Sequence, residues 1–278
     1  MFTLLNSRLP GDLSVEKKIS ARERRTVWKG RYRDIPVAIK RFARGHPALS
    51  TEWARKYSEF YAAMQGRDRI PSLVLHDPSS RIALFEWIDA DEHNLRVSSE
   101  RAGKWFNTRR TVTKSTHDFY PEAWISQSRS DMSLGRMLSE RRVARAGFSA
   151  MAELSAKLTT PLPFVWSSGD FALVNLIESG PELWLIDFDQ AADAPDLADA
   201  AWYLVTTDLQ LYTGRNYNPD LSRLLAEQQA FFSESTSPDP DQFRFFLIHA
   251  YLRAIADSKL SWPRHERAEE ALWLLLRE

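Results

Sequence analysis

Two short apolar runs in the second half of the chain border polar side chains at defined points. Residues 173–177 are apolar except for Asn175, and residues 183–186 lead directly into Asp187. The stretch 178–181 between them contains glycine and proline, which are typical of turns. We therefore expect two short buried strands joined by a tight turn, with Asn175 and Asp187 near one another at one end of this hairpin.

A second carboxylate, Asp170, stands in the loop that enters the first of these strands. Carboxylate and carboxamide oxygens are hard ligands of the kind that Mg²⁺ prefers, and a further carboxylate can orient a substrate hydroxyl. Asp170, Asn175 and Asp187 together are what phosphoryl transfer from ATP requires. Asp and Asn are also common turn residues, so each of the three has a structural alternative when it is taken singly.

A lysine among apolar residues lies nearer the other end of the chain. Residues 26–42 are predicted to form two strands around an Arg33-Asp34 turn, and the second strand contains Val37-Ala38-Ile39-Lys40. A lysine at this place can reach the phosphates of ATP as a point charge. The alternative is an ordinary outward-facing lysine in an alternating strand.

A helix near residues 50–65 is predicted to supply the partner of Lys40. Its apolar positions recur at helical spacing and are Leu49, Trp53, Tyr57, Phe60 and Met64. Glu59 lies in the helix interior beside this stripe, so we predict that Glu59 forms the ion pair that holds Lys40. Glu52, in the first turn, is explained by the helix dipole alone. The alternative for Glu59 is a surface pair with Lys56.

In their order along the chain, these segments resemble the protein-kinase-like superfamily. The matching pieces are Val37-Ala38-Ile39-Lys40, the helix with Glu59, a hinge-like Leu84-Phe85-Glu86-Trp87-Ile88, Gly169-Asp170 with Asn175, and Asp187-Phe188-Asp189. The resemblance implies an α+β bilobal kinase-like fold. An N-lobe with an antiparallel sheet and one helix is expected over residues 1–88, and a mainly helical C-lobe over 89–278. The expected N-lobe strands lie near 16–20, 26–31, 35–42, 72–76 and 81–88.

Within that superfamily the chain is more similar to small-molecule and sugar kinases, such as the aminoglycoside, choline and lipopolysaccharide-core Kdo and heptose kinases. Pro195-Asp196-Leu197-Ala198 follows Asp187 closely and resembles the helix-opening Asp-Leu-Ala of those enzymes. This leaves no room for a long activation segment. The resemblance implies an ATP- and Mg²⁺-dependent phosphotransferase acting on a hydroxyl of a small molecule or sugar, with a lipopolysaccharide-core-type sugar as one option.

The resemblance also assigns roles to single residues. Asn175 and Asp187 are expected to hold Mg²⁺ against the ATP phosphates, while Lys40 neutralises phosphate charge. Asp170 is expected to accept a hydrogen bond from the substrate hydroxyl and to aim it at the terminal phosphorus.

Two departures from the family pattern stand out. Ser168 takes the place of a histidine that usually precedes the catalytic carboxylate by two residues. The loop 21–26 contains no glycine, although glycine normally allows backbone amides to approach phosphate closely. Arginine side chains such as Arg24 can replace those amides by bidentate contacts, and an exposed charged hairpin tip is the alternative. By the same resemblance, adenine is expected at backbone groups of Glu86 and Ile88.

The stretch 93–140 is expected to be an irregular insertion on the substrate side, followed by the catalytic loop and helical core over 141–278. Its first part, 93–117, has a single acid and the basic residues Arg96, Arg101, Lys104, Arg109, Arg110 and Lys114. Two interpretations of this segment are possible: a basic lip that receives an anionic substrate, and a solvated loop. A helix is expected from about Leu134 or Arg141 to Leu158, and further helices are expected near 221–232, 240–258 and 264–277.

Composition excludes several classes of function. The net charge is zero and the pI is about 7.0, so no overall field selects nucleic acid or a membrane surface. The absence of cysteine excludes disulfides, thiol catalysis and cysteine zinc sites. The N-terminal apolar stretch is too short for a signal peptide and no run approaches a membrane span, so ATP dependence makes the cytoplasm the expected location. The oligomeric state is left open.

Two other functions remain as alternatives. One is a pseudokinase, in which the same fold serves as a binding module and the loop without glycine is a sign of lost catalysis. The other is a protein kinase, which the short segment after Asp187 disfavours.

Overall fold

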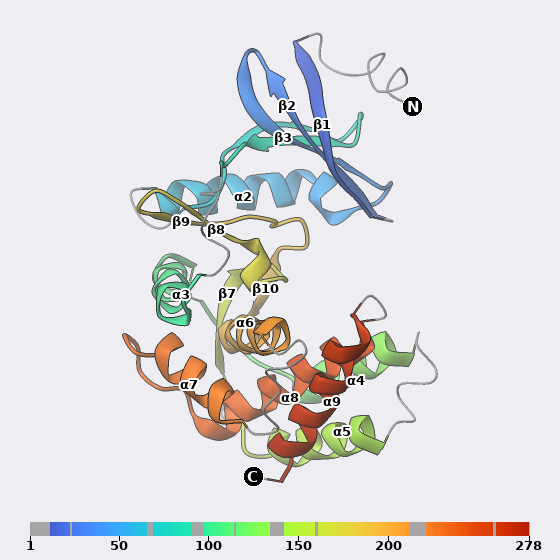
Figure 1. Ribbon diagram of the computed structural model, residues 1–278, viewed down its shortest axis with the longest axis vertical. Helices are drawn as coiled ribbons and strands as arrows, with labels where there is room; N and C mark the ends of the chain where they lie inside the picture. Colours follow the sequence, from blue (N-terminus) through green and yellow to red (C-terminus); the bar gives the residue numbers. More distant parts are fainter. Residues whose placement is uncertain are drawn as a thin grey trace. The chain divides into compact units, whose positions relative to one another are not determined.

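The computed structural model describes residues 12–22, 24–65, 69–89, 97–113, 115–133, 142–158, 161–211, 221–257 and 260–277. The chain forms two compact units, one of residues 1–95 with 177–191 and one of residues 96–176 with 192–278 (Figure 1). The expected α+β class is confirmed, because the first unit contains a five-stranded antiparallel sheet with a helix and the second is mainly helical. The expected boundary at residues 88 and 89 differs from this division, since 177–191 groups with the first unit.

The sheet of the first unit has the order β1-β2-β3-β5-β4, and every neighbouring pair is antiparallel. Its strands are β1 (Leu13–Arg22), β2 (Arg25–Tyr32), β3 (Ile35–Phe42), β4 (Leu73–Asp77) and β5 (Ile82–Glu86). Arg33 and Asp34 join β2 to β3 with φ values of 49° and 65°. Two positive φ values in a two-residue loop match the twist of the flanking strands, so the predicted turn is confirmed.

The two faces of this sheet are chemically different. One face is covered by an apolar cluster made of Leu13, Trp28, Val37, Ile39, Ile82 and Leu84. Lys40 pairs with Val27 and with Ala83 in the register, so its side chain lies on the opposite face. Arg25 stands two residues before Val27 and therefore shares the face of Lys40. Strand parity thus places Arg25 on the same face of the sheet as Lys40.

Helix α2 (Thr51–Met64) falls within the predicted region and follows the short 3₁₀ helix η1 (Pro47–Leu49), which was not predicted. The Ser50 hydroxyl accepts a hydrogen bond from the Trp53 amide at 3.1 Å, which satisfies one free N–H of the first turn. The buried side chains of α2 are Trp53, Tyr57, Phe60 and Met64, as its apolar spacing predicted. Trp53 and Tyr57 pack against Phe85 of β5 at ring distances of 6.3 and 5.5 Å.

The predicted hairpin is present as β8 (Leu176–Ser179) and β9 (Glu182–Leu185), which pair in a two-stranded sheet. Gly180 in its turn has a φ of 58°. The first strand begins later than predicted, because residues Leu173–Asn175 form the 3₁₀ helix η2. This turn brings the Asn175 side chain back to the carbonyl of Asp170, which an extended strand would not allow.

The second unit contains α3 (Ser99–Thr113), α4 (Pro121–Ser133), α5 (Arg142–Ser155), α6 (Asp196–Leu211), α7 (Ser222–Phe231), α8 (Pro240–Ala256) and α9 (Trp262–Leu275). A small antiparallel sheet has the order β10 (Ala192–Pro195), β7 (Leu162–Ser167) and β6 (Ser115–His117). Helix α8 is buried along most of its length and packs on α5, α6 and α9. No helix in the described ranges is both long and apolar enough to cross a bilayer.

The prediction that 93–140 is irregular was wrong for its described part, because α3 and α4 lie there. The buried positions of α3 include Ala102, Trp105, Phe106 and Arg109, at intervals of three and four residues. An arginine at a core position concealed this helical period. Residues 134–141, where the next helix was allowed to begin, lie outside the described residues.

Candidate active site

Four charged side chains meet in the first unit on the sheet face that carries Lys40. The Lys40 ammonium nitrogen lies 3.0 Å from Oδ1 of Asp187 and 2.8 Å from Oδ1 of Asp189. The Arg25 guanidinium pairs with both of these carboxylates. The exposed fraction of the four side chains is between 4% for Asp189 and 17% for Asp187, so this charged cluster is largely shielded from water. We call these four residues the Lys40 cluster.

The charges of the Lys40 cluster shift the pKa values of its members. Burial acts against the charged form of Asp187, but Lys40 and Arg25 outweigh it and hold the pKa of Asp187 well below its usual range. Burial raises the pKa of Asp189, and the charge of Asp187 adds to this rise against the opposing charge of Lys40. Burial would lower the pKa of Arg25, yet Asp189 and Asp187 raise it overall. Asp187 is therefore a carboxylate kept ionised, as a metal ligand must be.

The backbone holds Asp187 in an uncommon conformation, with a φ of 75°. Such a conformation costs on the order of 1 kcal/mol for a residue with a side chain and persists where its surroundings determine it. For Asp187, the contacts that determine this conformation are made by side chains of α2 with the next residue, Phe188. The Trp53 indole donates to the Phe188 carbonyl at 3.0 Å, and the Phe188 ring packs against Tyr57 and Phe60 at 5.9 and 5.5 Å. Anchoring of Phe188 therefore directs its neighbour Asp187 toward Lys40.

Glu59 does not pair with Lys40, so that prediction was wrong. The Glu59 side chain is 61% exposed and pairs with Arg55 four residues earlier on the same helix. Glu59 thus lies at the helix surface, as the alternative interpretation held, with Arg55 as a partner. The face of α2 toward the sheet is apolar, and the second carboxylate that binds Lys40 is Asp189 from the segment after β9. The signal for Asp189 in the sequence was its position two residues after Asp187.

Arg25, not Arg24, is the arginine of the β1–β2 turn that reaches the charged cluster. Arg24 is exposed, whereas the side chain of Arg25 is only 15% exposed. Alternation along β2 was the signal that could have found it, because Arg25 lies an even number of residues from Val27, the strand partner of Lys40.

The loop with Asp170 is held by hydrogen bonds in the second unit. The Asn175 amide nitrogen donates to the Asp170 carbonyl at 2.8 Å and to Oδ2 of Asp170 at 2.9 Å. The Trp202 indole, on α6, donates to Oδ1 of Asp170 at 2.7 Å. Both carboxylate oxygens of Asp170 are thus fixed in direction. The Asn175 carboxamide oxygen accepts no hydrogen bond from the described part of the chain.

Two further contacts support the same loop. The Arg253 guanidinium lies 3.9 Å from the centre of the Trp202 ring and donates to the Gly169 carbonyl at 2.9 Å. Gly169 has a φ of 73°, which glycine adopts without strain. The Ser168 hydroxyl accepts a hydrogen bond from the Asp170 amide at 3.3 Å, so the serine that replaces histidine takes part in holding the loop.

Two arginines of the basic segment 93–117 act inside the fold. Arg109 is fully buried and pairs with Asp199, and Arg110 pairs with Asp196 at 2.6 Å. Arg109 and Arg110 therefore fit neither the basic lip nor the solvated loop, because both pair with carboxylates of the fold. Their partners lie in the first turn of α6, where carboxylates also favour the helix dipole. Arg96 and Lys114 lie outside the described residues.

Glu86 and Ile88, the predicted adenine-binding residues, end and follow β5. The Glu86 amide donates to the Ser72 carbonyl at 3.0 Å, and the Glu86 carboxylate accepts from the Ser72 amide and hydroxyl at 3.2 and 3.1 Å. Among the described residues, the Ile88 amide makes no backbone hydrogen bond. The Ile88 amide is therefore available to an acceptor.

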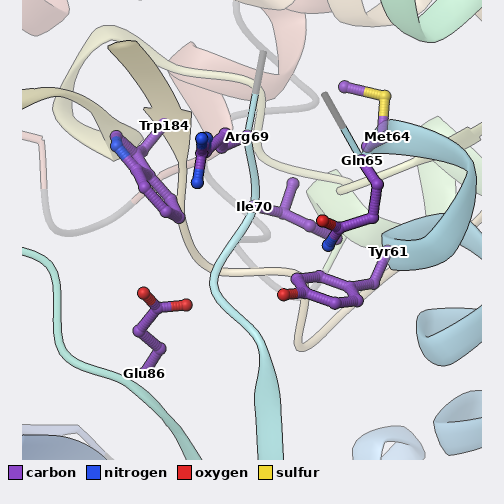
Figure 2. A pocket seen from close by; sticks show the side chains of 7 residues that line it. All are labelled: Tyr61, Met64, Gln65, Arg69, Ile70, Glu86 and Trp184. Carbon is purple, nitrogen blue, oxygen red and sulfur yellow. The ribbon is translucent and has the colours of Figure 1, made fainter. Parts of the chain in front are cut away.

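The Glu86 side chain also faces a small pocket of the first unit (Figure 2). The pocket is lined by Tyr61, Met64, Gln65, Arg69, Ile70, Glu86 and Trp184. The Arg69 guanidinium lies 5.5 Å from the Trp184 ring centre and pairs with Glu182 at 2.5 Å. No member of the Lys40 cluster lines this pocket.

The predicted site residues are divided between the two units. The first unit contains Lys40, Asp187, Glu86 and Ile88, and the second contains Asp170 and Asn175. Asp170 and Asn175 are in contact, as are Lys40 and Asp187. Proximity of Asn175 to Asp187 stays a prediction.

No protein-family model matches the sequence, and no curated protein is similar to it in sequence. Solved structures are similar over nearly the whole chain. A putative fructosamine-3-kinase from Thermobifida fusca has 15% identity and a TM-score of 0.62, covering 99% of this chain and 98% of its own. A choline kinase from Streptococcus pneumoniae has 17% identity and a TM-score of 0.56, covering 98% and 96%.

A spectinomycin phosphotransferase in complex with ADP and spectinomycin is also similar, with 12% identity and a TM-score of 0.58, covering 99% of this chain and 92% of its own. These matches share one architecture at low sequence identity. The chain therefore shares the fold of these solved structures, whose printed names are those of a choline kinase, a putative fructosamine-3-kinase and a spectinomycin phosphotransferase.

Proposed function

We propose that this protein is an ATP- and Mg²⁺-dependent phosphotransferase that transfers the γ-phosphoryl group to a hydroxyl of a small molecule or sugar. A lipopolysaccharide-core-type sugar is one candidate acceptor. The observation that carries the proposal is the ionised Asp187, held by strained backbone against Lys40 within the fold of small-molecule kinases. Use of ATP favours a cytoplasmic location.

The donor atoms suit the proposed metal ion. Asp187 offers a carboxylate whose pKa is lowered, and Asn175 offers a carboxamide oxygen whose own amide nitrogen is engaged by Asp170. Hard oxygen ligands of this kind bind Mg²⁺ together with phosphate oxygens. A bound Mg²⁺ would neutralise charge on the transferring phosphoryl group.

The remaining residues position the reactants in this proposal. Lys40 binds phosphate oxygens, and Asp170 accepts a hydrogen bond from the acceptor hydroxyl and directs it toward the phosphorus. Fixed hydrogen bonds from Asn175 and Trp202 set the direction of the Asp170 carboxylate, which supports this role. The Ile88 amide and the Glu86 carbonyl are proposed to bind the adenine edge.

The test compares Asp187→Asn with Asp34→Asn. Both aspartates have positive φ, at 75° and 65°, and asparagine tolerates that conformation, so neither substitution strains the backbone. Turnover is measured on protein that circular dichroism shows to be folded. The expected result is loss of ATP turnover in Asp187→Asn, with wild-type turnover in Asp34→Asn, across a panel of sugars, aminoglycosides, other small alcohols and proteins. Full turnover in Asp187→Asn would refute the proposal.

The same panel separates the two alternative functions. Nucleotide binding without turnover on any acceptor would identify a pseudokinase, the alternative that the loop 21–26 without glycine favours. Turnover on protein substrates alone would identify a protein kinase.

A further inference from the structure

Arg25 has a position that its sequence context does not require. It follows the turn between β1 and β2, yet its guanidinium turns inward and contacts both carboxylates of the Lys40 cluster. A surface arginine on an exposed hairpin has no need of two largely buried partners. Its place on the same sheet face as Lys40 instead makes two adjacent cations, because the register aligns Arg25 with Phe42 and Val27 with Lys40.

Within the described residues, the two cations of the Lys40 cluster pair with two carboxylates, and these differ in exposure. The Asp189 side chain is 4% exposed and contacts Lys40 at 2.8 Å, so it is the interior anchor. The Asp187 side chain is 17% exposed, and the same oxygen, Oδ1, receives both Lys40 and Arg25. A cation that binds Asp187 through Oδ1 must therefore compete with Arg25 for this oxygen.

Arginine is well suited to bind phosphate, the anion that would replace the Asp187 carboxylate as its partner. Its planar guanidinium matches the spacing of phosphate oxygens and stays charged when partly buried. The turn that precedes Arg25 has no glycine with which backbone amides could approach phosphate. A side chain from the first residue of β2 can supply the missing donors.

We propose that Arg25 is a second phosphate-binding cation beside Lys40, held by Asp187 and Asp189 until a nucleoside triphosphate and its metal ion bind. This inference rests on the proposed function. Binding of the metal at Asp187 frees the guanidinium of Arg25 from that carboxylate, and the phosphates then accept it. Asp189 keeps its contact with Lys40 throughout this exchange of partners.

The experiment measures binding and needs no turnover. Wild type, Arg25→Ala, Arg25→Lys and Arg24→Ala are titrated with Mg·ATP and, separately, with adenosine by isothermal titration calorimetry. Loss of a charge-assisted contact should weaken Mg·ATP binding to Arg25→Ala by about ten-fold or more, with partial retention in Arg25→Lys. Adenosine affinity should stay within about two-fold in every variant, because adenosine carries no phosphate. Arg24→Ala, which changes the exposed neighbour, should bind Mg·ATP like the wild type.

A second titration, with Mg²⁺ alone, distinguishes this role from a purely structural one. Removing the competing guanidinium should strengthen binding of Mg²⁺ to Arg25→Ala, so the two affinities should change in opposite directions. If Arg25→Ala binds Mg·ATP as tightly as Arg24→Ala, or loses adenosine affinity equally, the inference is refuted while the proposed function stands. If the wild type binds no Mg·ATP at millimolar concentration, the proposed function itself is refuted.

Discussion

The ammonium nitrogen of Lys40 lies 2.8 Å from Oδ1 of Asp189, across 149 positions of the sequence. Lys40 comes from the third strand of the sheet, and Asp189 from the segment that follows β9. The contact joins a strand to a loop that α2 holds in place through Phe188. Lys40 is thus aligned without any carboxylate from α2.

Asp189→Asn should impair the protein far more than Glu59→Gln. Asp189 is buried and neutralises two cations, so its loss leaves Lys40 and Arg25 with one carboxylate and should destabilise the fold by about 3 kcal/mol. Nucleotide turnover, measured on folded protein, should fall at least about ten-fold. Glu59→Gln removes an exposed pair and should change stability by less than about 1 kcal/mol. Urea denaturation and ATP turnover measure both effects, and equal effects of the two variants would contradict this assignment.

Trp202→Phe should lower kcat and leave the KM for ATP unchanged. The substitution keeps a ring beside Arg253 but removes the hydrogen bond to Oδ1 of Asp170. A hydrogen bond to a charged group contributes about 1.5–3 kcal/mol, so a fall in kcat of about ten-fold or more is expected. Trp262→Phe, at a position with 66% exposure, is the matched control. An unchanged kcat in Trp202→Phe would show that Asp170 does not depend on this donor.

Gly103→Ala should destabilise the second unit. A Cβ at this position of α3 would overlap the carbonyl oxygen of Phe231 in α7, and a backbone atom cannot move aside as a side-chain end can. Overpacking of this kind costs about 1–3 kcal/mol, against a gain of about 1 kcal/mol from helix propensity. In Gly147→Ala the new methyl meets side-chain carbons of Leu252 at 3.2 and 3.4 Å, which can shift. Chemical denaturation should therefore give a clearly lower free energy of unfolding for Gly103→Ala than for Gly147→Ala. The reverse order would contradict the packing of α3 on α7.

Stability should fall as the pH is lowered from 6.5 toward 4.5, in part through His249. Burial against α4 and the charge of Arg253 lower the pKa of His249 to about 3, and its ring lies 5.1 Å from that of Trp124. The unfolded chain takes up this proton near pH 6.5 and the folded chain only near pH 3, so acidification favours unfolding across the interval. His46, whose pKa is also lowered by burial, acts in the same direction.

The contribution of His249 is isolated by His249→Gln. Urea midpoints measured at several values between pH 7 and pH 4.5 should show a shallower pH dependence in the variant, and the slope that remains includes the contribution of His46. Identical slopes in variant and wild type would mean that His249 takes up its proton equally in the folded and unfolded chains.

Much of the first unit followed from local rules. The Arg33-Asp34 turn, the strand ranges and the apolar stripe of α2 each depend on neighbouring residues, and all three are present in the structure. The stripe showed which face of α2 is buried. It could not show that Glu59, at its edge, points to solvent, because a helix rotation of a fraction of a turn separates the two outcomes.

The helices of the second unit differ in how readily they could be predicted from the sequence. Helices were predicted over the ranges of α5 and α8, whereas α3 was missed because a core position is occupied by Arg109, whose charge is balanced by Asp199 far along the chain. A buried arginine can be recognised from its acidic partner. The partner of Arg109 is 90 residues away, so the sequence around Arg109 does not reveal it.

The sequence by itself determined the kind of chemistry available. It contains an apolar strand with Lys40, a loop with Asp170 and Asn175, and a carboxylate at the end of a hairpin, and these are local properties of residue type and spacing. Only the tertiary structure decided which charges meet. Arg25 and Asp189 became part of the Lys40 cluster because strand register and the packing of Phe188 on α2 bring them together through space, and electrostatic attraction depends on that distance and not on separation along the chain.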